Sequence, residues 1–160
     1  MLSPPKILYM LLKPKKRSFK KHHRYNHPRT IKRKTHLVYA DYGLVSKEFG
    51  LLNAAQIHAC IMTIKRSLKR KGQIWLRTYP HIPVTKKPLE VRMGKGKGGV
   101  DHWVTKVSPG SVIFEVAAPS GLIARTALES VSKKLPFKTS FIKVTFRKWG
   151  NVCSTFGELK

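Results

Sequence analysis

Apolar residues recur at helical spacing in a stretch that begins after Asn53. The recurring positions are three or four residues apart, which places them on one face of an α-helix: Ile57, Ile61, Ile64 and Leu68. Asn53 has the side chain of a good N-cap, and Gly72 is a residue that commonly follows a helix end. The pattern predicts a helix from Asn53 to about Lys71, stopped by Gly72.

A second helical pattern lies between Ser120 and Pro136. Its apolar residues are spaced by four: Ile123, Ala127, Val131 and Leu135. Ser120 is a suitable cap and Pro136 cannot continue a helix, so the prediction is a helix over Gly121 to Leu135.

Other segments have the alternation or β-branched content that is typical of strands. Leu37 to Tyr39 predicts a short strand, and Tyr42 to Leu44 predicts a turn. Pro109-Gly110 predicts the turn of a β-hairpin. The remaining predicted strands are Gln73 to Tyr79, Val100 to Val107, Ser111 to Val116 and Thr139 to Phe146.

The order of these elements predicts an α+β fold. Two amphipathic helices are expected to cover one side of a mixed or antiparallel sheet, in a two-layer sandwich. Pro80, Pro83 and Pro88 interrupt the connection that precedes the strand at Val100. Residues 37–147 are expected to form the globular domain, between an N-terminal extension at 1–36 and a tail at 148–160 without a clear pattern.

Composition adds a strong prediction about partners. The chain has 160 residues, 41% of them hydrophobic, which suffices for one domain with a core. It carries 33 Lys and Arg against 7 Asp and Glu, a formal net charge of +26. Self-repulsion of this size favours binding to a polyanion. Because the cations occur along the whole length, nucleic acid is a better candidate than a membrane surface, which would select one basic amphipathic helix.

The N-terminal extension is the most cationic segment. Residues 1–36 contain no acidic side chain and too few apolar groups to fold alone, so we expect this arm to become ordered along RNA phosphates. A solvated tail or a targeting sequence is the alternative. The predicted RNA-binding residues of the arm are Lys13, Lys15, Lys16, Arg17, Lys20, Lys21, Arg24, Arg29, Lys32, Arg33 and Lys34.

Cations also crowd the end of the first predicted helix. The negative end of the helix dipole accounts for two or three of them, and five indicate phosphate contact as well. We therefore add these residues, together with Arg77 of the following strand, to the predicted RNA-binding set: Lys65, Arg66, Lys69, Arg70, Lys71 and Arg77.

A glycine-rich loop separates the proline-rich connection from the strand at Val100. Its glycines alternate with cations, and only Met93 in the run is apolar: Arg92, Met93, Gly94, Lys95, Gly96, Lys97 and Gly98. A nucleotide-binding glycine loop would open a helix, but the β-branched residues from Val100 onward predict a strand. The composition therefore predicts an exposed loop that lies against an anionic partner, unless it is simply a solvated hairpin tip.

No catalytic or metal-binding constellation is apparent. The seven acids are scattered, Asp101 beside His102 is better explained as a charge balance at a loop end, and no cofactor is expected. The two cysteines, Cys60 and Cys153, form no metal-binding motif, and Cys60 is expected to be a buried apolar residue in a reducing compartment. We predict a binding protein without enzymatic activity.

Several segments, in order and spacing, resemble the bacterial-type large-subunit ribosomal protein L-sixteen family. The resemblance covers about Leu12 to Phe146, and its most specific part is the Arg-Met-Gly-Lys-Gly-Lys-Gly run. The other matching segments are Leu12 to Lys15, Asn53 to Ile57, Gln73 to Arg77, Pro83 to Pro88, Trp103-Val104 and Lys134 to Thr139.

This resemblance implies an α/β-hammerhead-like fold bound to large-subunit rRNA and to neighbouring ribosomal proteins, without homo-oligomers. It further implies that Lys13 to Lys34 and Arg92 to Gly98 reach toward tRNA and the peptidyl-transferase centre. The terminal extensions, and Val45 to Gly50 in place of a Gly/Arg-rich connection, favour a mitochondrial ribosome over a bacterial cytoplasmic or plastid one. An RNA chaperone or assembly factor that binds rRNA transiently is the alternative function.

Overall fold

The computed structural model describes residues 12–15, 21–23, 35–69, 71–147 and 150–155, with the backbone alone from 145 onward. Its elements follow one another in this order: β1 (Tyr42–Ser46), β2 (Gly50–Asn53), α1 (Ala54–Ser67), β3 (Gln73–Leu76), β4 (Ile82–Lys86), β5 (Gly99–Val107), β6 (Val112–Ala117), α2 (Gly121–Ser132), β7 (Thr139–Arg147) and β8 (Gly150–Thr155).

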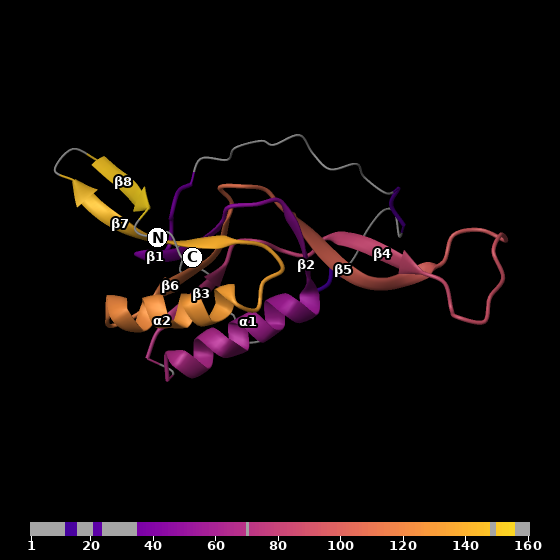
Figure 1. The fold of residues 1–160 in the computed structure, drawn as a ribbon, viewed down its shortest axis with the longest axis horizontal. Helices are drawn as coiled ribbons and strands as arrows, with labels where there is room; N and C mark the ends of the chain where they lie inside the picture. The colour runs from indigo at the N-terminus through magenta and orange to yellow at the C-terminus, as the bar shows by residue number, and fades with distance from the viewer. Residues whose placement is uncertain (1–11, 16–20, 24–34, 70, 148–149, 156–160) are drawn as a thin grey trace.

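The strands form two antiparallel sheets. The larger sheet has the order β3-β6-β1-β7-β8, and the smaller has the order β2-β5-β4. Both helices pack on one face of the larger sheet, and the β4–β5 hairpin extends away from this body (Figure 1). The α+β architecture with two helices over a sheet is as predicted, while the division of the strands into two sheets is not.

Helix α1 begins at a complete capping box. The Asn53 side chain accepts a hydrogen bond from the Ala55 amide, and the Gln56 side chain accepts one from the Asn53 amide. The expected apolar face is confirmed, since all four of its residues are buried: Ile57, Ile61, Ile64 and Leu68. The predicted end at Lys71 is wrong, because the helix ends at Ser67 and Lys69 already has a φ of +46°.

Gly72 therefore has another role than stopping α1. A Cβ at this position would lie 2.6 Å from the carbonyl oxygen of Ala117, so glycine lets the chain entering β3 approach β6 closely.

Helix α2 is shorter than predicted, and its predicted buried face is confirmed at Ala127 and Val131 but not at Ile123. It ends at Ser132, and Ser120 makes no side-chain capping bond. Ile123 is 40% exposed, so its assignment to the buried face is wrong. The residues that α2 buries combine three- and four-residue spacings: Ala124, Ala127, Leu128 and Val131.

The larger sheet is covered on both faces. Toward the helices, Phe114 and Leu44 are fully buried in the main core, which also takes in Leu52 and Val107 from the smaller sheet. On the helix-free face, Leu37 packs with Val45, Val112 and Ile142 in a second cluster: the chain that precedes β1 covers this face.

Two predictions about the strands are wrong. The strand lies at Tyr42–Ser46 instead of Leu37 to Tyr39. The Pro109-Gly110 turn forms, with Gly110 at a φ of +81°, but β5 and β6 belong to different sheets and make no hairpin. The turn instead forms hydrogen bonds with the end of β1. The Gly110 amide donates to the Ser46 carbonyl at 2.8 Å, and the Ser46 amide donates to the Ser111 carbonyl at 3.0 Å.

Three strands were not expected: β2, β4 and β8. Each is short and pairs with a single neighbour: β2 and β4 pair with β5, and β8 pairs with β7. In β4, Pro83 lies opposite Trp103. Proline is tolerated in this strand because β4 lies at the edge of the smaller sheet.

Candidate nucleic-acid interface

The glycine-rich loop lies at the far end of the β4–β5 hairpin. The β4–β5 pairing extends out to Lys86 opposite Gly99, and the loop between these residues projects beyond the body (Figure 1). Arg92, Lys95 and Lys97 are all exposed, and the Met93 side chain is 99% exposed. The loop therefore presents three cations and an apolar side chain to any partner at the end of a two-stranded stem.

Glycine is used in this loop for two separate reasons. Gly94 and Gly96 have φ values of +92° and +88°, with Lys95 between them at +53°, so the backbone turns through the left-handed region. Gly98 allows the two sides of the loop to approach each other closely, because a Cβ there would lie 2.5 Å from the Lys86 carbonyl oxygen. The Lys87 ammonium also donates to the Gly94 carbonyl across the loop.

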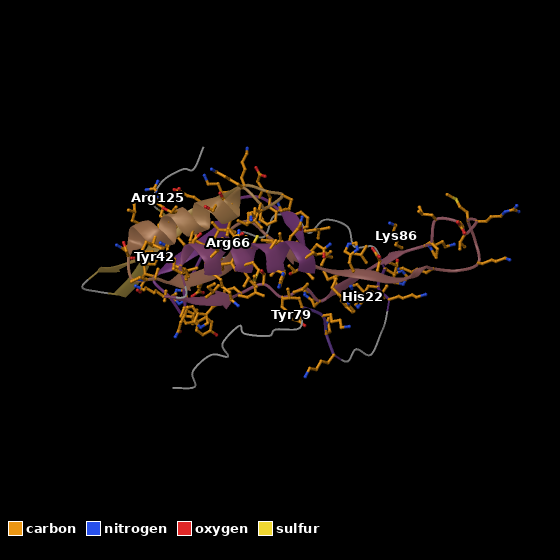
Figure 2. All side chains as sticks on the ribbon, turned by 90° about the horizontal axis from the view of Figure 1, so that it is seen from below. His22, Tyr42, Arg66, Tyr79, Lys86 and Arg125 are labelled. Atoms are coloured by element: carbon orange, nitrogen blue, oxygen red, sulfur yellow. The ribbon has the colours of Figure 1, made fainter. Side chains whose placement is uncertain are left out.

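The described part of the N-terminal arm contacts the same hairpin. The Lys21 ammonium donates to the Lys97 carbonyl at 2.7 Å, and the Lys97 ammonium donates to the His22 carbonyl. Figure 2 shows His22 beside the hairpin. A groove of about 580 Å³ lies between these two segments, and its lining includes His23, Thr85 and Lys106. The structure thus brings together two regions that the sequence predicted separately.

The cations of α1 lie elsewhere. Lys65 and Arg66 are exposed in its last turn, followed by exposed Lys69 and Lys71. The helix starts beside β2 and ends on the side of the body away from the hairpin (Figure 1). The structure therefore does not join these cations to the loop.

Arg77 makes an intramolecular contact that its sequence context did not suggest. Its guanidinium forms an ion pair with Glu115, a fully buried carboxylate on β6, and lies 5.4 Å from the centre of the Tyr39 ring. Glu115 was not among the predicted site residues. Its position in a run of buried strand residues, Val112–Ala117, is the only signal that the sequence offered.

Lys13 and Lys15 are exposed, and Leu12 beside them packs against the main core. The other predicted RNA-binding residues lie outside the described part of the chain: Lys16, Arg17, Lys20, Arg24, Arg29, Lys32, Arg33, Lys34 and Arg70.

Within the described residues, no group of three or more His, Cys, Asp or Glu side chains is arranged to hold a metal ion. Asp101 and His102 contact each other at 2.8 Å, on the exposed outer part of β5. None of the helices in the described chain has the length and apolar character that a membrane span requires.

The fold and its charge define a class, a small basic α+β protein with a cationic loop on an extended hairpin. Residues 14–142 match the model of the family described as Ribosomal protein L16p/L10e. This match covers most of the chain, and the chain belongs to that family.

Individual relatives agree with the family match. The chain is 42% identical over 135 residues to the large ribosomal subunit protein uL16 of Buchnera aphidicola, covering 84% of this chain and 98% of the relative. It is 43% identical over 135 residues to that of Psychrobacter arcticus, with the same coverage. For Leptospira biflexa the identity is 41% over 133 residues, covering 83% and 97%.

Proposed function

We propose that this protein is a structural constituent of the large ribosomal subunit that binds rRNA. The observation that carries the proposal is the family membership over residues 14–142, together with relatives named as large-subunit proteins. Its partners are then large-subunit rRNA and neighbouring ribosomal proteins. It acts by binding and not by catalysis.

The mechanism is neutralisation of RNA phosphates. With a formal net charge of +26, the chain screens phosphates of RNA helices that approach each other, and its arm and hairpin fix the register of these contacts. The arm lysines and arginines contribute roughly additively. Their contribution weakens as salt rises, because each neutralised phosphate releases counterions.

The loop from Arg92 to Gly98 faces the aminoacyl-tRNA site near the peptidyl-transferase centre. The exposure of its three cations and its reach beyond the body support this role. The planar guanidinium of Arg92 suits bidentate contact with phosphate or a base edge. The hydrogen bonds between the loop and Lys21 and His22 support a joint action of loop and arm.

We further propose that the particle is a mitochondrial ribosome, with a bacterial cytoplasmic or plastid ribosome as the alternatives. Residues 1–11 and about 148–160 lie beyond the segment that matches the family, and such terminal extensions favour an organelle. Immunodetection after fractionation of the source cells decides among the three: the protein co-purifies with mitochondria, with plastids or, in a bacterial source, with the cytoplasmic ribosomes.

Sedimentation tests the main proposal. A structural constituent stays with the large subunit through a moderate salt wash, at one copy per particle. A transient RNA chaperone or assembly factor, the second candidate, leaves mature subunits on the wash and is enriched on immature ones. Loss of the protein from mature subunits would overturn the proposal.

A further inference from the structure

The carboxylate of Glu115 binds three backbone amides of the segment that leads from the arm into β1. Its Oε2 accepts hydrogen bonds from the amides of Val38, Tyr39 and Ala40 at 3.1, 2.7 and 3.2 Å. Its Oε1 accepts from the Arg77 guanidinium. Residues 38–40 form none of the strands, so these bonds replace the ladder that their amides lack.

Side-chain packing supports the same segment from both sides. The rings of Tyr39 and Trp75 stack with centroids 6.3 Å apart and planes at 17°. Leu37 covers Gly43, where a Cβ would lie 2.4 Å from a Leu37 methyl carbon. The Thr35 hydroxyl donates to the Gly110 carbonyl at 3.2 Å. Residues 35–40 are thus fixed along the helix-free face of the larger sheet.

Because Glu115 is buried, its carboxylate depends on the hydrogen bonds that residues 38–40 and Arg77 donate. Glu115 has 0% exposure, and a buried carboxylate without partners carries a large desolvation cost. Four donors compensate it here, and three of them are amides of residues 38–40. Displacing this segment would leave the carboxylate with Arg77 alone. The buried charge of Glu115 therefore favours the one conformation of residues 38–40 in which their amides point at its carboxylate.

We infer that Glu115 and Arg77 form a latch that fixes the direction in which the cationic arm leaves the body, and thereby positions the arm for RNA binding. This inference rests on the proposed function. Lys32, Arg33 and Lys34 directly precede the latched segment in the sequence. Glu115 is a positioning residue: it is buried and acts on RNA only through the chain that it holds.

The test compares Glu115→Gln with Glu129→Gln in the full-length chain. Both substitutions remove one negative charge and one ion pair, but Glu129 lies on the surface of α2, 2.8 Å from Arg125. Glu115→Asp is a second variant, which keeps the charge and withdraws the carboxylate from the amides. Each variant is made in the native background and in one with Lys32, Arg33 and Lys34 replaced by Gln.

Affinity for refolded large-subunit rRNA is measured against salt, and thermal unfolding is recorded in parallel. In the native background, Glu115→Gln and Glu115→Asp are expected to weaken binding several-fold and to lower the log–log salt slope by about one, the loss of about one phosphate contact. In the neutralised background neither has this effect. In both backgrounds, Glu129→Gln is expected to change the rRNA affinity only by the small effect of removing one surface charge.

Two results would overturn the latch: equal losses of affinity in both backgrounds, which indicate general destabilisation, or no loss in either for a variant that is folded. A different result overturns the proposed function of the arm: full rRNA affinity and an unchanged salt slope when Lys32, Arg33 and Lys34 are neutralised with Glu115 intact.

Discussion

The backbone of Lys86 passes so close to Gly98 that a Cβ at Gly98 would meet three of its neighbours: the Lys86 oxygen at 2.5 Å, the Lys86 carbonyl carbon at 2.7 Å and the Lys87 amide at 3.0 Å. All three are backbone atoms, so a side chain cannot be accommodated by rotating a neighbour. This contact closes the neck of the loop, which is the point where Gly98 passes the backbone of Lys86 and Lys87.

We predict that Gly98→Ala opens the neck of the loop at a cost of about 1–3 kcal/mol in hairpin stability, since overpacking forces the backbone apart. Hydrogen exchange of the β4–β5 amides and incorporation into large subunits measure the effect. Gly99→Ala is the matched control, because a Cβ there meets nothing within 4 Å. Equal behaviour of the two variants would contradict the role of the close approach.

Arg92→Ala is expected to slow tRNA accommodation or subunit maturation without unfolding the protein, because Arg92 is exposed on the loop. Purified mutant ribosomes give the rate of aminoacyl-tRNA entry, and gradient profiles give the maturation. Arg125→Ala removes the same charge from α2, where the arginine pairs with Glu129, and serves as control. Normal entry kinetics together with normal assembly would refute a role of Arg92.

Asn53→Ala should destabilise the protein by about 1 kcal/mol, because it removes a capping bond from the start of α1. Ser120→Ala at the start of α2 should be nearly neutral, since the Ser120 side chain makes no capping bond. Thermal or denaturant unfolding of both variants checks the difference. A cost at Ser120 as large as that at Asn53 would disprove the explanation.

Burial raises the pKa of the Cys60 thiol from 9.0 to about 11, an effect that nearby Lys134 partly offsets. The folded state therefore holds the proton more tightly than the unfolded state. The stability that this provides is complete below pH 9 and is lost as the pH rises through 11. The free energy of unfolding, measured from pH 8 to 11, should fall less steeply with pH in Cys60→Ala than in the native chain.

The same burial predicts slow chemistry at this thiol. Cys60 is fully buried within α1, and the thiolate is the reactive form. Alkylation of Cys60 at pH 7.5, followed by peptide mass spectrometry, should be slow in the folded chain and rapid in denaturant. Fast alkylation of the folded protein would show that the core around α1 opens readily.

Local sequence patterns were sufficient for the features that depend on near neighbours. The buried face of α1 follows from the spacing of Ile57, Ile61, Ile64 and Leu68, and its cap follows from Asn53. The exposed loop follows from glycines alternating with cations, which have nothing to bury. The turn at Gly110 likewise needs only a residue that accepts a positive φ.

Features that depend on distant partners were missed. Nothing near Glu115 in the sequence indicates that its carboxylate binds the amides of residues 38–40, more than 70 residues earlier. Strand β4 contains Pro83 and forms only because β5 supplies its partner. The orientation of α2 depends on the surface beneath it, which is why Ile123 was placed on the wrong face.

The sequence by itself determined the α+β class, the cationic loop and the family resemblance. It determined the buried faces of the helices only in part. These are properties of residue order and charge. Only the tertiary structure decided that the strands divide into two sheets, that Lys21 and His22 bond to the loop, and that Arg77 turns inward to Glu115. The physical reason is that strand pairing and buried charge compensation are long-range contacts, whose free energy depends on which distant groups the folded chain brings together.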